Sequence, residues 1–284
     1  MSANVLAQPA PDVGTGRSIV FRTRGHTHGP VVRMVSPPDV GEMIKPFVFL
    51  DFVNTQAPIS QQGSGWHPHS GIATLSLLIE GQARYAESNG HAGSLEAGDI
   101  EWMSAGSGIW HTGTAEPPVK GFQLWIALPA ELELAPAFSH YLSINEIPSD
   151  GPARVLLGRS GKAVSPIDAP PGINYFDVQL KAGQCWTYEP PQGYQVGWIA
   201  VMDGGLRTPD PVGEGELVVF DHSDAVIEFE ATADARFVFG TAIPHPHDLH
   251  LGYYSVHTSD AALIEGEREI ARIGNELRAK GVLG

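Results

Sequence analysis

Short apolar runs follow one another along most of the chain, and glycine, proline or aspartate separates each run from the next. Runs of this length that are rich in Val, Ile, Phe and Trp and end in turn-forming residues are typical of β-strands. Strands are predicted at residues 18–23, 31–35, 46–53, 74–81, 99–105, 121–128, 154–158, 174–180, 197–205, 215–221, 225–231 and 235–242. Gly81 is expected to end the fourth of these strands in a turn. The pattern predicts an all-β protein.

The second half of the chain repeats the first half. The sequence "IPSDGPA" near residue 150 interrupts the run of strands, after which the same pattern resumes. "LLIEG" in the first half corresponds to "AVMDG" in the second, and "EAGDIEWMS" corresponds to "GEGELVVFD". Two tandem copies of one all-β unit are the simplest explanation. We expect a flexible tail at 1–16, a first unit at 17–147 and a second unit at 148–258.

The last segment, 259–284, changes to a helical pattern. Its apolar residues recur at the spacing of one helix face, namely Leu263, Ile270, Ile273 and Leu277. Ser259 or Asp260 can serve as the N-cap, and Gly281 can follow the C-terminus. A C-terminal helix is predicted, with its apolar face packed against the body of the protein.

Composition narrows the classes of partner. The 284 residues carry a formal net charge of −15 and a pI near 5.1, which disfavours nucleic acids and anionic lipid surfaces. Neither a secretory signal nor an apolar run long enough to span a membrane is present, so a cytoplasmic protein is expected. Cys185 is the single cysteine and has apolar neighbours, so we expect a small buried core residue.

A pair of histidines stands immediately before one of the predicted strands. In "GWHPHSGIATL", His67 and His69 are separated only by Pro68. Side chains at positions i and i+2 of a strand point to the same face, so the two imidazoles are expected to converge. Such a pair can provide two ligands to a metal ion and requires others to complete the site.

A third histidine follows a glycine-rich corner. In "EAGDIEWMSAGSGIWHTG", Gly106 and Gly108 allow a tight turn after a strand, and His111 stands where the chain enters the next strand. We expect His67, His69 and His111 to meet on two facing strands and to form a three-imidazole metal site. Trp66 and Trp110, which precede ligand positions, should face away from the metal.

Three sequence segments carry a resemblance to a known family. "HPHSGIATLSLLIEG", "GSLEAGDIEWMSAGSGIWH" and "GFQLWIALP", between about Phe47 and Pro129, resemble the pirin family of the cupin superfamily. The resemblance implies two tandem cupin barrels of the double-stranded β-helix, or jelly-roll, type. It also implies one mononuclear metal, usually iron, in the N-terminal barrel (17–147) and no metal in the C-terminal barrel (148–258).

The chain departs from the family pattern at two ligand positions. In pirins a glutamate two residues after the third histidine completes the metal site, and here that position is Gly113. The other carboxylate typical of cupins, four residues after the second histidine, corresponds to Ala73. Three neutral imidazoles remain, for which Fe(II) is the expected ion and Ni, Cu, Zn or Mn are alternatives. Glu116 is a conceivable substitute ligand from a nearby loop.

These features support two main functional hypotheses. The first is a quercetinase-like, metal-dependent dioxygenase that acts on a flavonol- or catechol-like aromatic substrate. The alternative is a non-catalytic protein that senses metal or redox state and binds a protein partner, because a site without its carboxylate suits weak, reversible metal occupancy. A barrel that binds a small molecule without any metal is a third interpretation.

The remaining histidines have simpler explanations. His26 and His28 lie in a glycine-flanked stretch with no partner nearby, so a solvated loop is expected. "IPHPHDLHLGYYSVH" contains four more histidines, interspersed with proline and aspartate. A surface turn is expected there, with a transient metal-binding patch as the alternative, for His245, His247, His250 and His257.

Overall fold

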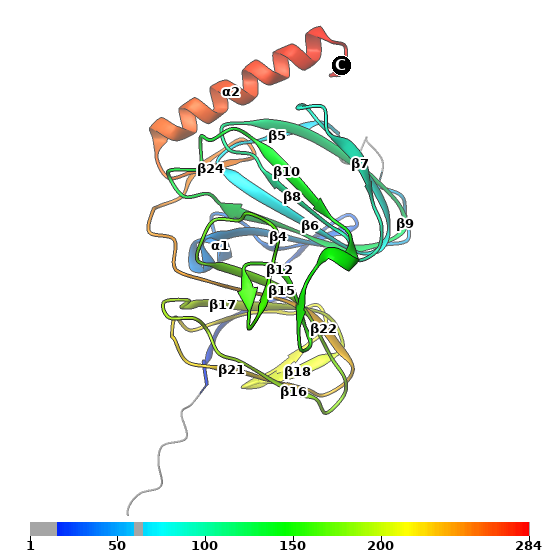
Figure 1. Cartoon of the computed structure of the whole chain (residues 1–284), viewed down its shortest axis with the longest axis vertical. Helices are drawn as coiled ribbons and strands as arrows, with labels where there is room; N and C mark the ends of the chain where they lie inside the picture. The colour runs from blue at the N-terminus through cyan, green and yellow to red at the C-terminus, as the bar shows by residue number, and fades with distance from the viewer. Residues whose placement is uncertain (1–15, 60–64, 284) are drawn as a thin grey trace, which may run out of the picture.

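The fold consists of two β-barrels that stack through the faces of their sheets, with a long helix across the far side of the first barrel (Figure 1). The computed structural model describes residues 16–59 and 65–283. The predicted tail at 1–16 therefore lies outside the described residues, apart from Gly16. The predicted all-β class and the C-terminal helix are confirmed. Within the described residues, no helix is long and apolar enough to cross a membrane.

The N-terminal barrel is built on a sheet of order β10-β8-β6-β9-β4-β3-β2, to which β5 is added through β9 and β7 through β6. Its strands are β2 (His26–His28), β3 (Val31–Val35), β4 (Phe47–Thr55), β5 (His67–His69), β6 (Ile72–Glu87), β7 (Ala92–Leu95), β8 (Ile100–Ser104), β9 (Ile109–Ala127) and β10 (Phe138–Leu142). Two short helices, α1 (Val40–Ile44) and the 3-10 turn η1 (Ile144–Glu146), connect elements at its edges.

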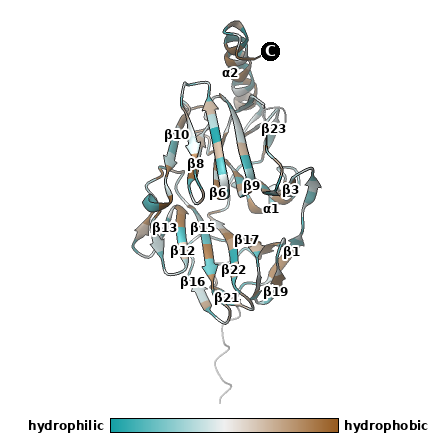
Figure 2. Cartoon of the chain, turned by 90° about the vertical axis from the view of Figure 1, so that its right-hand side faces the viewer, coloured by the Kyte–Doolittle hydropathy of each residue, from teal (hydrophilic) through white to brown (hydrophobic). Residues whose placement is uncertain are grey.

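The C-terminal barrel pairs a sheet of order β1-β20-β17-β22-β15-β12-β11 with a smaller one of order β16-β21-β18-β19. Hydrophobic and hydrophilic residues alternate along strands such as β15 (Figure 2). The strands are β1 (Ile19–Thr23), β11 (Ser149–Asp150), β12 (Ala153–Leu157), β13 (Arg159–Ser160), β14 (Ala163–Val164), β15 (Ile173–Leu180), β16 (Cys185–Tyr188), β17 (Val196–Asp203), β18 (Gly205–Thr208), β19 (Asp210–Gly213), β20 (Leu217–Phe220), β21 (Ile227–Ala231) and β22 (Ala235–Ala242).

Strands β6 and β9 are longer than the apolar runs that predicted them. They pair from Ile72↔Ala127 to Glu87↔His111, with register shifts on both sides of Glu80. The turn expected at Gly81 is therefore wrong, because the strand continues through an irregularity there. Gly81 has a φ of 96°, and a Cβ on it would lie 2.2 Å from the carbonyl oxygen of Pro118. The bend lets this strand pair curve around the barrel.

Near each end of the described residues, a segment packs on the barrel that is more distant in sequence. Strand β1 pairs with β20, and the buried Arg17 guanidinium donates hydrogen bonds to the carbonyl oxygens of Tyr194 and Gln195, both at 2.8 Å. In the other direction, the hairpin of β23 (His250–Gly252) and β24 (Ser255–His257) packs against the N-terminal barrel together with helix α2 (Asp260–Ala279). The boundaries at 147/148 and 258/259 remain predictions for separate folding units.

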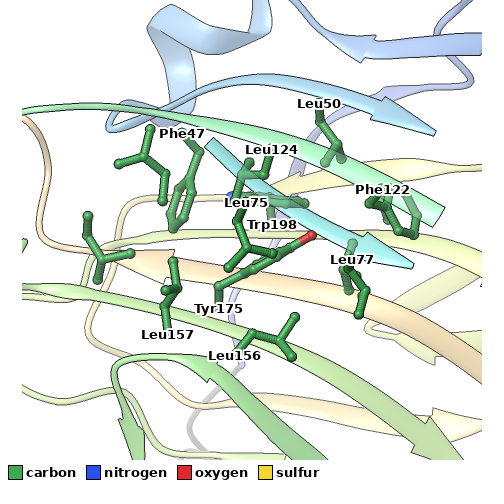
Figure 3. Close-up of a cluster of buried hydrophobic side chains, with 14 of the residues drawn as sticks. Phe47, Leu50, Leu75, Leu77, Phe122, Leu124, Leu156, Leu157, Tyr175 and Trp198 are labelled. Atoms are coloured by element: carbon green, nitrogen blue, oxygen red, sulfur yellow. The ribbon is translucent and has the colours of Figure 1, made fainter. Parts of the chain in front are cut away.

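A shared hydrophobic core joins the two barrels. Side chains from β4, β6 and β9 interleave with side chains from β12, β15 and β17, and most of them are completely buried (Figure 3). Phe47 meets Trp198 edge to face, with ring centroids 5.4 Å apart. The labelled residues of this core are Phe47, Leu50, Leu75, Leu77, Phe122, Leu124, Leu156, Leu157, Tyr175 and Trp198.

The predicted caps of the C-terminal helix are observed. The Ser259 hydroxyl accepts a hydrogen bond from the Ala262 amide, and Gly281 adopts a φ of 69° just after the helix. Ile270 and Leu277 are buried on the face toward the barrel. The prediction that Cys185 is a core residue is wrong, because Cys185 is exposed. Along β16 the inward positions belong to Trp186 and Tyr188, which leaves Cys185 on the outer face.

Candidate metal site

Three imidazole nitrogens meet inside the N-terminal barrel. The Nε2 atom of His111 lies 2.9 Å from Nε2 of His67 and 3.1 Å from Nε2 of His69. His69 and His111 are buried, and His67 is half-buried. Among the described residues, these three form the one group of histidine, cysteine or carboxylate side chains arranged to hold a metal ion.

The strand pairing explains this convergence. Strand β5 pairs antiparallel with β9, so that His67 stands directly opposite His111 and His69 opposite Ile109. Directly opposed residues project to the same face, as do residues i and i+2. The glycine corner before β9 is also required, because Gly106 has a φ of 51° and a Cβ there would lie 2.0 Å from the carbonyl oxygen of Ala135.

Hydrogen bonds set which nitrogen of two of these rings faces the centre. Nδ1–H of His67 donates to the carbonyl oxygen of Gly65 at 2.8 Å, and Nδ1–H of His69 donates to that of Tyr254 at 3.1 Å. A carbonyl oxygen can only accept, so each Nδ1 carries the proton and each Nε2 presents a lone pair. Outer-shell partners of this kind orient metal-binding histidines in many proteins.

Burial keeps the three rings neutral. Desolvation, together with a smaller contribution from the neighbouring His67, lowers the pKa of His69 to about 3. Desolvation also lowers the pKa of His67, and it lowers the pKa of His111 well below the usual value. Neutral rings that present lone pairs to one another at about 3 Å repel unless a proton or a cation lies between them.

The geometry of the donors fits a transition metal. Two nitrogen ligands at ~2.1 Å from a metal and at right angles to each other are about 3.0 Å apart. The observed Nε2 separations of 2.9 and 3.1 Å match that value. Three imidazoles on one side of an ion would leave the opposite positions open, which suits nitrogen-preferring metals such as Fe, Ni, Cu and Zn.

No carboxylate is placed among these donors in the described part of the chain. Glu116 does not lie in a loop: it is exposed on β9, opposite Gln82. Two buried carboxyl groups, those of Glu87 and Glu101, belong to the same barrel, but they cluster around Tyr141. The loss of the usual acidic ligands at Ala73 and Gly113 is therefore not compensated by a neighbouring acid within the three-histidine group.

Aromatic side chains surround the histidines. The Trp125 ring lies 4.8 Å from the His69 ring and stacks on Phe49 at 4.1 Å. The Tyr254 ring lies 5.5 Å from His67 and comes from the turn between β23 and β24. Sequence reasoning missed Tyr254, because it follows His67 by more than 180 residues and no motif connects the two positions.

The structure separates the histidines of the other two histidine-rich segments into two groups. His26 and His28 are exposed on β2, as expected, although they form a strand instead of a loop. The expectation of a surface turn is wrong for His245 and His257, which are 8% and 1% exposed. The reason is tertiary: this segment packs onto the N-terminal barrel, which its polar composition did not reveal. His247 is exposed, and its ring lies 5.5 Å from that of His245.

A surface hollow of about 520 Å³ lies in the C-terminal barrel, and its lining residues are distant in sequence from the three histidines. Trp186 and Tyr188 line it together with the charged side chains of Asp150, Arg159 and Glu189. The described residues that line it include no histidine and no group of metal donors. The size of a hollow alone does not identify a functional site. The three converging imidazoles are the better candidate, because they are the group with chemical capacity.

Comparison with known proteins identifies the family. The family model for pirin matches residues 30–126, which include all three histidines. A pirin-like protein of Caulobacter vibrioides is 33% identical over 235 residues, covering 78% of this chain and 84% of that protein. The chain belongs to the pirin family. The resemblance found in the sequence is thus confirmed.

Two further comparisons extend over nearly the whole pirin chain. A Pseudomonas aeruginosa protein that is provisionally named a quercetin 2,3-dioxygenase is 30% identical over 271 residues, covering 88% of this chain and 93% of that protein. The crystal structure of a quercetin 2,3-dioxygenase from Acinetobacter baumannii has a TM-score of 0.79 at 22% identity, covering 91% of this chain and 98% of that one. At that identity the structural match establishes the fold, with two barrels and a C-terminal helix.

Proposed function

We propose that His67, His69 and His111 bind one mononuclear transition metal, with Fe(II) as the expected ion and Ni, Cu, Zn or Mn as alternatives. The observation that carries the proposal is the meeting of three Nε2 atoms at 2.9 and 3.1 Å, two of them on rings whose Nδ1–H donates to a backbone carbonyl. A site arranged in this way is preorganised for a cation.

We further propose that this pirin is a quercetinase-like dioxygenase that acts on a flavonol- or catechol-like substrate. The name of its Pseudomonas relative supports the reaction class. Trp125 and Tyr254, which flank the histidines, support a planar aromatic substrate, because aromatic rings favour stacked contacts. A bound metal would supply Lewis acidity and redox chemistry toward dioxygen.

A regulatory role is the second candidate, and the absence of acidic ligands favours it. The donor group contains three neutral imidazoles and no carboxylate among the described residues. Without an anionic oxygen to offset a dication, metal binding should be weaker and more easily reversed. Such a pirin would respond to metal or redox state and pass that response to a protein partner without turning over a substrate.

The first test is the metal content of the wild type and of the variants His67→Ala, His69→Ala and His111→Ala. After anaerobic loading with Fe(II), mass spectrometry should find about one equivalent of metal in the wild type, and each variant should lose most of it because one of three ligands is gone. His28→Ala, which removes an exposed histidine of another H-x-H pair, should match the wild type. Less than a tenth of an equivalent in the wild type would contradict the metal site.

The second test separates enzyme from regulator. An oxygen electrode should record uptake by the iron-loaded wild type with quercetin or a simple catechol, and His67→Ala should abolish that uptake. Equal traces for the wild type and the variant, with metal present in the wild type, would contradict the dioxygenase and leave the regulatory role as the better account.

A further inference from the structure

The turn between β23 and β24 closes on the strand that carries two of the histidines. Ser70 and Ser255 form a parallel bridge, and the Val256 amide donates to the Ser70 carbonyl oxygen at 3.3 Å. One residue earlier on each side, Nδ1–H of His69 donates to the carbonyl oxygen of Tyr254 at 3.1 Å. The hairpin thus supplies a hydrogen bond that orients a ring of the metal site.

Tyr254 holds this position in an unusual conformation. Its φ is 54°, and no other residue with a Cβ has a positive φ in the described part of the chain. Residues other than glycine persist in this region only where their surroundings hold them there. Contacts with residues outside the turn are therefore expected to hold this conformation.

A buried chain of polar groups lies directly under the turn. Nδ1–H of His257 donates to the Glu133 carboxylate at 2.9 Å, and Nε2 of the same ring lies 3.0 Å from the Ser70 hydroxyl oxygen. The Ser70 hydroxyl donates to that of Ser255 at 2.9 Å. Exposure is at most 3% for all four residues. Glu133 also accepts from the amide of Thr258 at 2.7 Å and from its hydroxyl at 2.6 Å, which anchors the far end of the chain.

This order of serine, histidine and carboxylate matches that of a hydrolase triad, but its surroundings do not. Ser70 is completely buried, so no substrate carbonyl can reach its hydroxyl. Helix α2 covers it: a Cβ on Gly266 would lie 2.6 Å from the Ser70 hydroxyl and 2.5 Å from Nε2 of His257. These buried polar groups hold backbone segments together, and the helix leaves no space for a substrate beside them.

We propose that Glu133, His257 and Ser70 are positioning residues for the metal site, which lock the β23–β24 hairpin so that the Tyr254 carbonyl holds the His69 ring with its Nε2 toward the ion. The inference rests on the proposed binding of a metal by the three histidines. It makes the C-terminal segment part of the site, although no residue of that segment is a ligand.

The test is titration of the metal-free, full-length protein with Co(II), followed by the ligand-field absorption of the bound ion. His257→Asn and Glu133→Ala should weaken Co(II) binding about 10- to 100-fold, the usual effect of losing an outer-shell partner, and should shift the absorption bands. His250→Asn is the matched control, because His250 lies directly opposite His257 in the hairpin and also pairs with a carboxylate, the exposed one of Asp260. It should bind Co(II) within twofold of the wild type with the same spectrum.

Three outcomes would decide against the inference or its premise. If the wild type shows no Co(II) bands that His67→Ala removes, the metal site itself fails. If the wild type binds Co(II) and His257→Asn gives the same affinity and spectrum, the positioning role is overturned. If neither His257→Asn nor Glu133→Ala folds, Ser70→Ala, a smaller change, is titrated with Co(II) in the same way. Hydrolysis of p-nitrophenyl acetate by the wild type that Ser70→Ala abolishes would overturn positioning in favour of a nucleophile.

Discussion

The Glu101 carboxyl group is the most strongly perturbed acid of the N-terminal barrel. Burial, with a smaller contribution from the nearby Glu87 carboxylate, raises its pKa to about 7, although hydrogen bonds with Ser76 and Tyr141 lower it. One of its oxygens has no hydrogen-bond partner. Glu87, in contrast, accepts hydrogen bonds from Tyr141, Ser139 and Asn89. Glu101 is therefore buried with one oxygen unpaired, whereas three side chains donate hydrogen bonds to Glu87.

Replacing Glu101 by glutamine should stabilise the fold at high pH. An unfolded glutamate ionises near 4.5 and the folded one near 7, so the folded state loses stability as the pH rises between these values. Glu101→Gln removes that penalty, and its free energy of unfolding should exceed that of the wild type by about 1–3 kcal/mol at pH 8. At pH 5 the difference should be clearly smaller, because most of the loss occurs between pH 5 and pH 7.

Urea unfolding of both proteins at pH 5 and pH 8 measures this difference. Glu116→Gln, which changes an exposed glutamate of the same barrel, is the control. Its free energy of unfolding should equal that of the wild type at both pH values. A gain for Glu101→Gln that is larger at pH 5 than at pH 8 would contradict the assignment of a raised pKa.

At the scale of elements, helix α2 packs on β5 and β9, the strands that carry the three histidines. The Trp110 indole N–H donates to the carbonyl oxygen of Ile270 at 2.7 Å, so the residue next to His111 packs on the helix and points away from the histidines, as its position in the strand predicted. Gly266 and Gly274 let the helix approach closely, since a Cβ on either would come within 3 Å of a side chain beneath it. The helix therefore covers the buried side chains of Ser70 and His257.

Gly266→Ala should destabilise the protein although alanine favours helices. The change gains up to ~1 kcal/mol in helix propensity. However, the new methyl group would lie 2.5 Å from His257 and 2.6 Å from Ser70, and overpacking of this kind costs about 1–3 kcal/mol. Thermal unfolding should show a lower midpoint for Gly266→Ala.

Glu265→Ala is the control, because it also introduces an alanine, one residue earlier and on the exposed face of the helix. It should leave the midpoint unchanged or slightly higher. A midpoint for Gly266→Ala that equals or exceeds that of Glu265→Ala would show that the helix can move away from the barrel without cost.

At the scale of the whole molecule, the two barrels share one core and exchange their ends. Trp198 of the C-terminal barrel is completely buried against Phe47 of the N-terminal barrel. Strand β1 completes the C-terminal sheet, while the β23–β24 hairpin and α2 cover the N-terminal barrel. Loss of packing at the shared core should therefore affect both barrels together.

Trp198→Ala should lower the free energy of unfolding by about 3–5 kcal/mol, the usual cost of deleting a buried aromatic side chain. Circular dichroism and tryptophan fluorescence, followed together in urea, should give coincident transitions. Ile264→Ala, on the exposed face of α2, should change stability by less than ~0.5 kcal/mol. Two separated transitions in the wild type would contradict the coupling of the barrels.

The sequence by itself determined most of the local structure and the centre of the site. Alternating apolar residues predicted the strands, because only one face of a strand is buried, and the spacing in "HPH" placed two imidazoles on one face. It also showed the loss of the acidic ligands at Ala73 and Gly113. These are properties of neighbouring residues, and neighbours in sequence remain neighbours in space.

Only the tertiary structure decided which distant segments meet. The burial of His257, the contact of Tyr254 with His69 and the exchange of β1 all join residues that lie far apart in the chain. No periodicity in the sequence distinguishes these residues from surface residues. The wrong expectations for His245 and His257 follow from this. Cys185 was misplaced for a similar reason: apolar neighbours suggest burial, but the pleat of the folded strand decides which face each residue occupies.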